Sequence, residues 1–242
     1  MVLDVDAPSA PAQEGLLGTG ISEIDKKLNG GLPPGSLTLI EGESDAGKTP
    51  LVQQFIWGCL DAGKRVALYT TENTTTTLLR QMRDMNIDVD DYFILGRLHV
   101  FNLPAVVDED TSHVMYEMFL SHVQTLDVDV VFFDGVTAFA SHADQQDTLQ
   151  FFSKAREMCD RGVTLVVTLH AYATPEELLV RLLSLCDAHL RLKVEDLGQR
   201  LCKTLDVLKI RGAARREGTA VVCFEIEPGI GLAVIPVFKA KL

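Results

Sequence analysis

The stretch GESDAGKTP, residues 42–50, decides the fold. Gly42, Gly47, Lys48 and Thr49 satisfy the pattern G-x-x-x-x-G-K-[ST]. An apolar run before the stretch predicts a buried strand, and the residues after it predict a helix. Glycines let the backbone curl so that several N–H groups point at one anion, and the helix adds its positive N-terminal end. The stretch therefore predicts a cradle for a chain of phosphates.

The residues of this phosphate loop have separate predicted tasks. Lys48 is expected to reach the β- and γ-phosphates, and the Thr49 hydroxyl is expected to ligate Mg²⁺. The alternative is a glycine-rich turn that matches the pattern by accident, which the flanking strand and helix disfavour. The predicted nucleotide-binding residues of the loop are Gly42, Glu43, Ser44, Asp45, Ala46, Gly47, Lys48, Thr49 and Pro50.

Pro50 departs from the usual form of such a loop. Proline is sterically acceptable in the first turn of a helix, but it has no N–H. In many phosphate loops the residue at this position donates its N–H to the α-phosphate, and losing that bond should cost about 1.5–3 kcal/mol. We therefore expect nucleotide binding to survive with a weaker grip, because Lys48 and the metal site are unaffected.

Polar residues end three other predicted strands, at the sheet edge where α/β proteins bind ligands. Asp134 is predicted to serve Mg²⁺ directly or through water, and the alternative is a plain strand end. Glu72 is predicted as the catalytic residue that orients or deprotonates the attacking water, and the alternative is a loop carboxylate. The roles of Thr168 and His170 stay open between sensing the γ-phosphate and a structural task.

The composition indicates a globular chain of the cytoplasm. It has 242 residues, of which 47% are hydrophobic, and a formal net charge of −12. That charge would repel a nucleic-acid backbone, so nucleic acid is not an expected partner. The five cysteines form no CxxC pair, which argues against zinc or redox sites. We see no apolar run of membrane-spanning length and no signal peptide, and therefore expect a cytoplasmic protein.

Predicted strands and helices alternate over most of the chain, which favours an α/β fold with a largely parallel sheet and helices on both faces. A short helix with Ser22 as its N-cap precedes the first strand. Residues 1–15 are predicted to be a flexible tail, and residues 16–242 a single domain. Strands are predicted at residues 37–42, 65–71, 95–103, 129–134 and 163–170, and at the β-rich end at 188–195, 204–212, 219–228 and 231–238. Further helices are predicted at 50–62, 77–85, 114–126, 147–162 and 175–186, with an acidic loop at 108–110.

The order of these features resembles the KaiC-like ATPases of the RecA superfamily. The specific part is TGISEIDKKLNGGLPPGSLTLIEGESDAGKT, residues 19–49, and TTEN, VVFFDGVTAF and LKIRG follow in the family's order. The resemblance covers roughly residues 18–240. It is most detailed with the archaellar branch of the family, through GESDAGKT, YTTE, DYFILGRLHVF and IRGAA. The resemblance implies a RecA-like core that binds ATP and Mg²⁺ between the subunits of a ring, usually a hexamer.

Residue by residue, the resemblance matches Lys48 and Thr49 to the phosphate-loop pair and Asp134 to the metal-binding carboxylate. Lys209 and Arg211, in LKIRG, match basic residues that family members extend toward the γ-phosphate of a neighbour. Such a cation would supply charge that one subunit lacks. The alternative is that both residues line the exposed face of a hairpin.

The functional expectation follows from the resemblance to the archaellar branch and from the absence of a second glutamate after Glu72. The circadian members have two adjacent glutamates where this chain has Glu72 and then Asn73, which favours weak or absent hydrolysis. The archaellar branch implies an ATP-dependent regulator that docks on the hexameric motor ATPase FlaI within a scaffold ring, recruited by these partners to the inner face of the membrane. The alternatives are an active KaiC-like ATPase or autokinase and, disfavoured by charge, a recombinase-type DNA-dependent ATPase.

Overall fold

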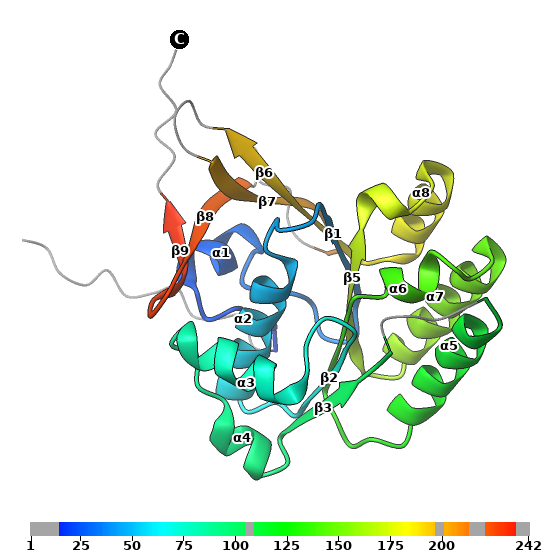
Figure 1. Ribbon diagram of the computed structural model, residues 1–242, viewed down its shortest axis with the longest axis horizontal. Helices are drawn as coiled ribbons and strands as arrows, with labels where there is room; N and C mark the ends of the chain where they lie inside the picture. The colour runs from blue at the N-terminus through cyan, green and yellow to red at the C-terminus, as the bar shows by residue number, and fades with distance from the viewer. Residues whose placement is uncertain (1–14, 105–108, 197–200, 213–220, 236–242) are drawn as a thin grey trace, which may run out of the picture.

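A nine-stranded sheet forms the centre of the molecule (Figure 1). The computed structural model describes residues 15–104, 109–196, 201–212 and 221–235. The strand order is β3-β2-β4-β5-β1-β6-β7-β8-β9, parallel from β3 to β6 and antiparallel from β6 to β9. This arrangement confirms the predicted α/β class with its β-rich C-terminal end. The strands are β1 (Leu37–Gly42), β2 (Val66–Thr70), β3 (Leu98–Asn102), β4 (Val130–Asp134), β5 (Thr164–His170), β6 (Ala188–Asp196), β7 (Leu201–Ile210), β8 (Val221–Glu227) and β9 (Gly231–Ile235).

Helices cover both faces of the sheet, α1 to α4 on one face and α5 to α8 on the other (Figure 1). Within the described ranges, none is long and apolar enough to cross a membrane. The helices are α1 (Ser22–Lys27), α2 (Lys48–Asp61), α3 (Thr75–Asp84), α4 (Asp90–Ile94), α5 (Glu109–Val123), α6 (Thr137–Ala140), α7 (Gln145–Cys159) and α8 (Glu176–Leu185), with a 3₁₀ turn η1 (Ala171–Ala173) after β5.

Burial of the central strands on both sides explains why their sequences are predominantly apolar. Every residue of β1, β2 and β4 is buried. Alternate residues serve different cores: Leu39 packs in the cluster beneath α7, whereas Ile40 packs in the cluster beneath α2. A parallel sheet sandwiched between helices requires this composition, because neither strand face meets water.

The structure corrects the predicted starts of two helices. Helix α2 begins at Lys48 rather than at residue 50, because Gly47 adopts a left-handed φ of 95° and turns the chain directly into the helix. Ser22 was predicted as the N-cap of α1, and this is wrong: Ser22 is the first helical residue, and Ile21 holds the cap position without a side-chain bond. The Asp25 carboxylate instead accepts from the backbone N–H of Thr19 at 2.7 Å, and so fixes the entry to the helix.

Three further segments differ from their predictions. The strand predicted at 95–103 begins only at Leu98, because α4 occupies the preceding residues. Glu109 and Asp110 were predicted to lie in a loop, but α5 begins at Glu109. The short helix α6 was not predicted, since four residues are too few to show a helical period. The tail predicted at 1–15 lies outside the described residues except for Gly15.

Gly58 provides a test of how closely α2 packs against the chain before α1. A Cβ atom on this residue would lie 2.4 Å from the carbonyl oxygen of Gly18. Gly58→Ala should therefore lower the free energy of unfolding by about 1–3 kcal/mol, although alanine favours a helix by about 1 kcal/mol. Asp61→Ala, on the exposed end of the same helix, is the control and should not destabilise. Urea unfolding measures both, and an unchanged or higher midpoint for Gly58→Ala would contradict the packing.

Candidate nucleotide-binding site

The phosphate loop joins β1 to α2 at the carboxyl edge of the parallel strands. Asp45 and Gly47 have positive φ angles of 58° and 95°, in the left-handed region that favours glycine. A Cβ atom on Gly47 would also lie 3.3 Å from the side chains of Lys203 and Phe224. The backbone conformation therefore favours glycine at position 47, and a larger residue would also be tight against the side chains of the C-terminal strands.

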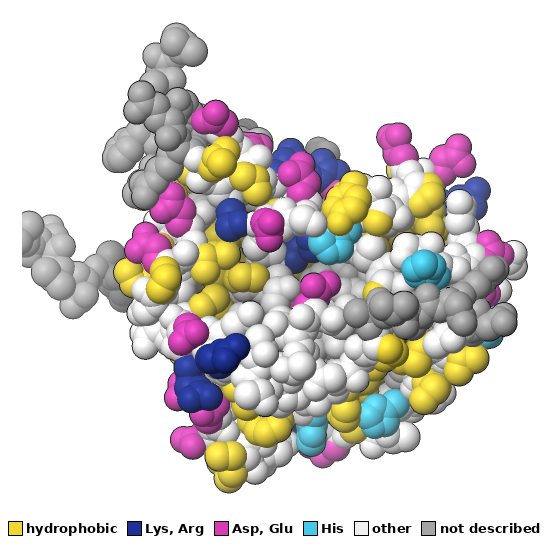
Figure 2. Space-filling model, viewed as in Figure 1, with side chains coloured by type: hydrophobic (Ala, Val, Ile, Leu, Met, Phe, Trp, Pro, Cys, Tyr) yellow, Lys and Arg dark blue, Asp and Glu magenta, His cyan; other side chains and the backbone are white. Residues whose placement is uncertain are grey.

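A pocket of about 370 Å³ opens above this loop. Figure 2 shows acidic, basic and histidine side chains gathered on this face of the molecule, between α2 and α8. The pocket brings together predicted residues from three strand ends and adds residues from β7 and β8. Its lining is Ser44, Asp45, Gly47, Lys48, Thr49, Pro50, Glu72, Asp134, Thr168, His170, Lys203 and Ile226.

Lys48 is held at the floor of the pocket by acceptors of its own loop and of β5. Only 7% of the residue is exposed. Its Nζ donates to the carbonyl oxygens of Gly42 at 3.2 Å and Glu43 at 2.7 Å, and lies 3.1 Å from Nδ1 of His170. Burial lowers the pKa of Lys48, and the charges of Asp134, Glu72 and Asp45 act in the opposite direction. The ammonium is thus positioned where it can exchange these carbonyl contacts for an anion in the pocket.

Thr49 and Asp134 form the pair expected at a magnesium site. The Thr49 hydroxyl donates to Oδ2 of Asp134 at 2.8 Å, and Asp134 is 2% exposed. Hydroxyl and carboxylate oxygens are hard ligands that suit Mg²⁺, which usually takes only one or two protein ligands beside phosphates and water. The donor set fits Mg²⁺ bound together with a nucleotide.

The sequence left the role of Thr168 open, and the structure gives it a definite task. Its hydroxyl accepts from the backbone N–H of Gly135 at 2.8 Å and donates to Oδ1 of Asp134 at 2.7 Å. Burial raises the pKa of Asp134, the hydroxyls of Thr168 and Thr49 lower it, and the charge of Glu72 raises it. Thr168 therefore holds the buried carboxylate in one orientation, beside the loop.

His170 lines the pocket from the last position of β5. Burial lowers its pKa, and the positive charge of Lys48 lowers it further. The neutral ring can accept from Lys48 through Nδ1, and the backbone N–H of His170 donates to the Thr137 hydroxyl at 2.8 Å. Two residues later, the Tyr172 hydroxyl lies 3.2 Å from the Ser44 hydroxyl and connects η1 to the loop.

Glu72 reaches the pocket from the chain after β2. Its backbone N–H donates to the Thr70 hydroxyl at 3.0 Å, which fixes the turn that carries it. Its negative charge influences the pKa values of Lys48, Asp134 and His170. The structure therefore places the predicted catalytic carboxylate in the same pocket as the predicted metal site, where it can orient a water molecule.

Sequence reasoning missed Lys203 and Ile226, which line the pocket from β7 and β8. Lys203 donates through Nζ to the backbone carbonyl of Asp45. Both residues belong to strands about 160 residues or more beyond the loop in the chain. Their alternating pattern indicates strands, but it carries no signal of what those strands approach.

Lys209 and Arg211, in contrast, lie away from the pocket of their own subunit. Ile210 pairs with Ala188, and Ala188 pairs with Thr38 near the start of β1, whereas the loop follows Gly42 at the other end of that strand. At about 3.3 Å per residue, this separation exceeds 10 Å along the sheet. The two cations can therefore meet bound phosphates only across a contact with another molecule.

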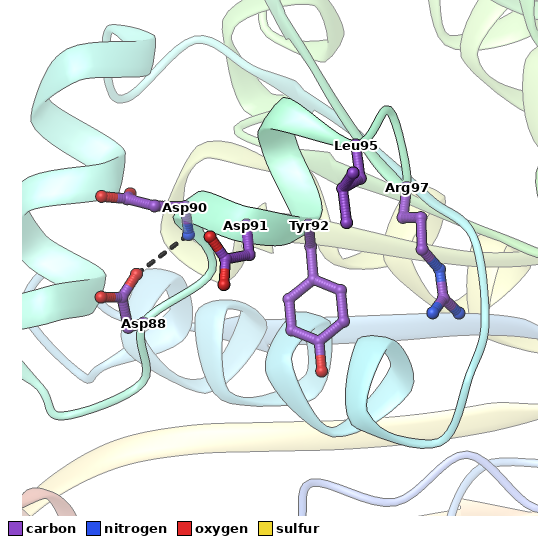
Figure 3. Close-up of a pocket in the computed structure, with 6 residues that line it drawn as sticks. All are labelled: Asp88, Asp90, Asp91, Tyr92, Leu95 and Arg97. Carbon is purple, nitrogen blue, oxygen red and sulfur yellow. Dashed lines mark hydrogen bonds between the residues drawn. The ribbon is translucent and has the colours of Figure 1, made fainter.

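A second hollow, of about 440 Å³, lies beside α4 (Figure 3). Its lining is Asp88, Asp90, Asp91, Tyr92, Leu95 and Arg97. Arg97 lies over the Tyr92 ring, 5.7 Å from its centroid. The lining has three carboxylates and one guanidinium, which Figure 3 shows on opposite sides of Tyr92. This excess of negative charge would repel a triphosphate, so the smaller pocket at the loop is the better nucleotide site.

The raised pKa of Asp134 leads to a prediction with a definite sign. A carboxyl whose pKa is raised by folding disfavours the folded state while it is ionised, because the unfolded chain releases the proton more readily. Asp134→Asn should therefore raise the Tm of the nucleotide-free protein by about 2–4 °C, which corresponds to roughly 1 kcal/mol in a chain of this size. The same change should abolish the additional stabilisation by Mg²⁺ with ATP.

Thermal unfolding with and without Mg²⁺ and ATP measures both effects. Asp91→Asn at the α4 hollow is the matched control, and it should still be stabilised by Mg²⁺ with ATP. A lower Tm for nucleotide-free Asp134→Asn, or unimpaired stabilisation by the ligand, would contradict the assignment.

Comparison with known proteins identifies the family of this chain. A family model described as "ATPase: KaiC" matches residues 17–238. The archaeal flagellar ATP-binding protein FlaH of Sulfolobus acidocaldarius is 27% identical over 229 residues, covering 93% of this chain and 99% of that protein. FlaH of Methanocaldococcus jannaschii is 26% identical over 217 residues, covering 88% and 91%. The circadian clock oscillator protein KaiC of Parathermosynechococcus lividus is 23% identical, covering 83% of this chain and 37% of that protein.

Solved structures show the same fold. The crystal structure of the flagellar accessory protein FlaH from Methanocaldococcus jannaschii superposes with a TM-score of 0.79 at 22% identity, covering 92% of this chain and 99% of that one. A KaiC-like protein from Pyrococcus horikoshii gives a TM-score of 0.71 at 21% identity, covering 95% and 100%. The match of the family model over most of the sequence shows that this chain belongs to the KaiC ATPase family.

Proposed function

We propose that this chain is an ATP-binding regulatory component of the archaellum motor, in which bound nucleotide controls the assembly of copies into a ring. The observation that carries the proposal is the placement of Lys48, Thr49 and Asp134 in one pocket. The near full-length similarity to archaeal flagellar ATP-binding proteins supports the archaellar context. In this proposal the ring, a hexamer, docks on the motor ATPase FlaI and is recruited by the scaffold ring to the inner face of the membrane.

The loop and its neighbours divide the work of holding ATP. The backbone of residues 42–50 and the Lys48 ammonium hold the phosphates, and Thr49 with Asp134 holds Mg²⁺. The metal ion, when bound, neutralises charge on the phosphates. Thr168 keeps the Asp134 carboxylate aimed at the metal position through its 2.7 Å bond.

Assembly depends on cations that one subunit cannot bring to its own pocket. Arg211 and Lys209 sit at the sheet edge opposite the loop, so a head-to-tail arrangement would present them to the next subunit. A ligand that contacts two subunits favours the assembled state through linkage, because it binds that state more tightly. ATP bound at the loop then acts as the bridge between neighbours.

Weak hydrolysis fits the chemistry of the pocket. A single carboxylate, Glu72, stands where a water molecule would be oriented, and Asn73 after it cannot act as a base. Because Glu72 does line the pocket, an active ATPase or autokinase is the second candidate. Release of inorganic phosphate by the purified protein at the turnover of an ordinary ATPase would favour that candidate over the regulatory one.

Pro50 tests the strength of the phosphate grip. It is the third residue of α2, where a backbone N–H would otherwise be free to donate to a phosphate. Pro50→Ala restores that donor and should lower the Kd for ATP about tenfold to a hundredfold, the equivalent of about 1.5–3 kcal/mol. Titration with a fluorescent ATP analogue measures the change, with Lys48→Ala as the control that binds poorly. An unchanged Kd for Pro50→Ala would show that this position does not face the phosphates.

Mixed subunits test the bridge itself. Lys48→Ala keeps its cations but loses its pocket, whereas Arg211→Ala keeps its pocket but loses a cation. At a protein concentration just sufficient for the unmodified protein to assemble with Mg²⁺ and ATP, neither variant alone should assemble. An equimolar mixture should form dimers at that concentration, because one complete contact is possible in each pair. Light scattering measures the mass. A ring formed by Arg211→Ala alone, or a mixture that stays monomeric while the unmodified protein assembles, would contradict the proposal.

A further inference from the structure

We propose that Asp187 is a positioning residue that sets Arg211 for its contact with a neighbouring subunit while tying it to the strand that leads into the phosphate loop. This inference rests on the proposed function, because it assigns Asp187 a part in the contact between subunits. Asp187 lies between the end of α8 and the start of β6, and 5% of it is exposed. A carboxylate so deeply buried requires partners whose attraction offsets the free-energy cost of its desolvation.

The partners of Asp187 come from β1, from the chain at the end of β7, and from α7. Its Oδ2 accepts from the backbone N–H of Leu37, at the start of β1, at 3.0 Å. Its Oδ1 lies 3.1 Å from Nη1 of Arg211 and also accepts from Nη1 of Arg156 on α7. Backbone bonds reinforce both links: Asp187 donates to the Leu37 carbonyl at 2.7 Å, and Arg211 donates to the Asp187 carbonyl at 2.8 Å. One residue thus connects the loop strand to the end of β7.

Arg211 and Lys209 differ in how many of their side-chain N–H donors remain available to bind a neighbouring subunit. The Lys209 ammonium donates to the carbonyl oxygens of Leu183 and Cys186 at 3.1 and 2.6 Å, and so caps the end of α8. The Arg211 side chain is 55% exposed. Among the described residues, its side-chain contact is to Asp187 through one nitrogen, and a guanidinium carries five N–H donors in a fixed fork. Arg211 is therefore oriented by Asp187 and still has donors that face outward.

Arg156 shares the buried charge of Asp187, so Arg211 can offer its other donors to a neighbour while it keeps its own bond to Asp187. Arg156 pairs with Asp187 and, through Nε at 3.3 Å, with Asp160. The four side chains alternate in sign, from Asp160 through Arg156 and Asp187 to Arg211. When Arg211 directs its remaining N–H donors at the phosphates of a neighbour, its Nη1 stays bonded to Asp187, and Arg156 supplies a second counter-charge. A buried carboxylate without enough positive partners is strongly unfavourable, and the second arginine avoids that cost.

The same carboxylate gives the contact between subunits a route to the nucleotide. Leu37 begins β1, and the loop follows directly after Gly42 at the end of that strand. A neighbour that binds Arg211 therefore acts through Asp187 on the start of β1, which is fully buried and pairs with β5 on one side and β6 on the other. Occupancy of one pocket can in this way affect the loop of the subunit that supplies the cation.

A double-mutant cycle tests the inference on the full chain. Asp187→Asn, Arg211→Ala and the double variant are compared for the protein concentration at which Mg²⁺ and ATP induce assembly, measured by light scattering. Asp187→Asn should raise that concentration at least tenfold, while uptake of a fluorescent ATP analogue by monomers is unchanged. Adding Asp187→Asn to Arg211→Ala should cause no further change, because Asp187 acts through Arg211. Effects of the two changes that multiply would show a merely structural Asp187 and would overturn the inference.

Asp160→Asn is the matched control, since it removes an acid from the same Arg156 without touching Arg211, and it should assemble like the unmodified protein. If Asp187→Asn fails to fold, as judged by thermal unfolding, Asp187→Glu takes its place. This variant keeps the carboxylate and should assemble within about threefold of the unmodified protein, and a loss as large as that of Arg211→Ala would overturn the inference. Normal assembly by Arg211→Ala would instead refute the proposed contact between subunits, whereas its loss beside a normal Asp187→Asn refutes only the role of Asp187.

Discussion

The buried carboxylate of Asp134 is the point on which the site depends. It ends a strand that is buried along its whole length, and it is held by hydroxyls from two directions, Thr49 on α2 and Thr168 on β5. These bonds bring the first turn of α2 to the carboxyl ends of β4 and β5. The loop must then turn sharply between β1 and α2, which accounts for the left-handed Gly47 and for the position of Lys48 beneath the pocket. The hydrogen bonds of the Asp134 carboxylate thus connect the phosphate loop to the edge of the sheet.

The same sheet also separates what one subunit holds from what it can offer to another. β6 continues the parallel order from β1, and β7 then returns antiparallel. This reversal carries Lys203 to the loop and takes Arg211 to the opposite edge, although eight positions separate them in the sequence. In the proposed ring, β7 and the residue after it therefore contribute to the nucleotide pocket at one end and to the contact with a neighbour at the other. In the proposed function, ring assembly is possible because the length of β7 separates Lys203 at the loop from Arg211 at the opposite edge of the sheet.

Much of the fold and most of the pocket lining could be predicted from local signals. The strands β1, β4 and β5 are predominantly apolar because both sheet faces are covered, and such runs are visible in the sequence. Lys48, Thr49 and Asp134 were predicted because their spacing and strand-end positions follow from the chemistry of phosphate and magnesium. The N-cap of α1 was predicted wrongly, because Asp25 satisfies the entry from within the helix and Ser22 is not needed. α4 and α6 are too short for their periods to be read.

The sequence by itself determined the phosphate loop, the class of the sheet and the acids at its edge, since each of these is encoded by residues that are close together in the chain. The tertiary structure alone decided which distant side chains meet: Lys203 beside the loop, Thr168 on Asp134, and Asp187 between Leu37 and Arg211. These contacts join residues that are tens to more than a hundred positions apart. Their geometry depends on strand order and on the antiparallel return of β7, and no local pattern of residue types specifies either one.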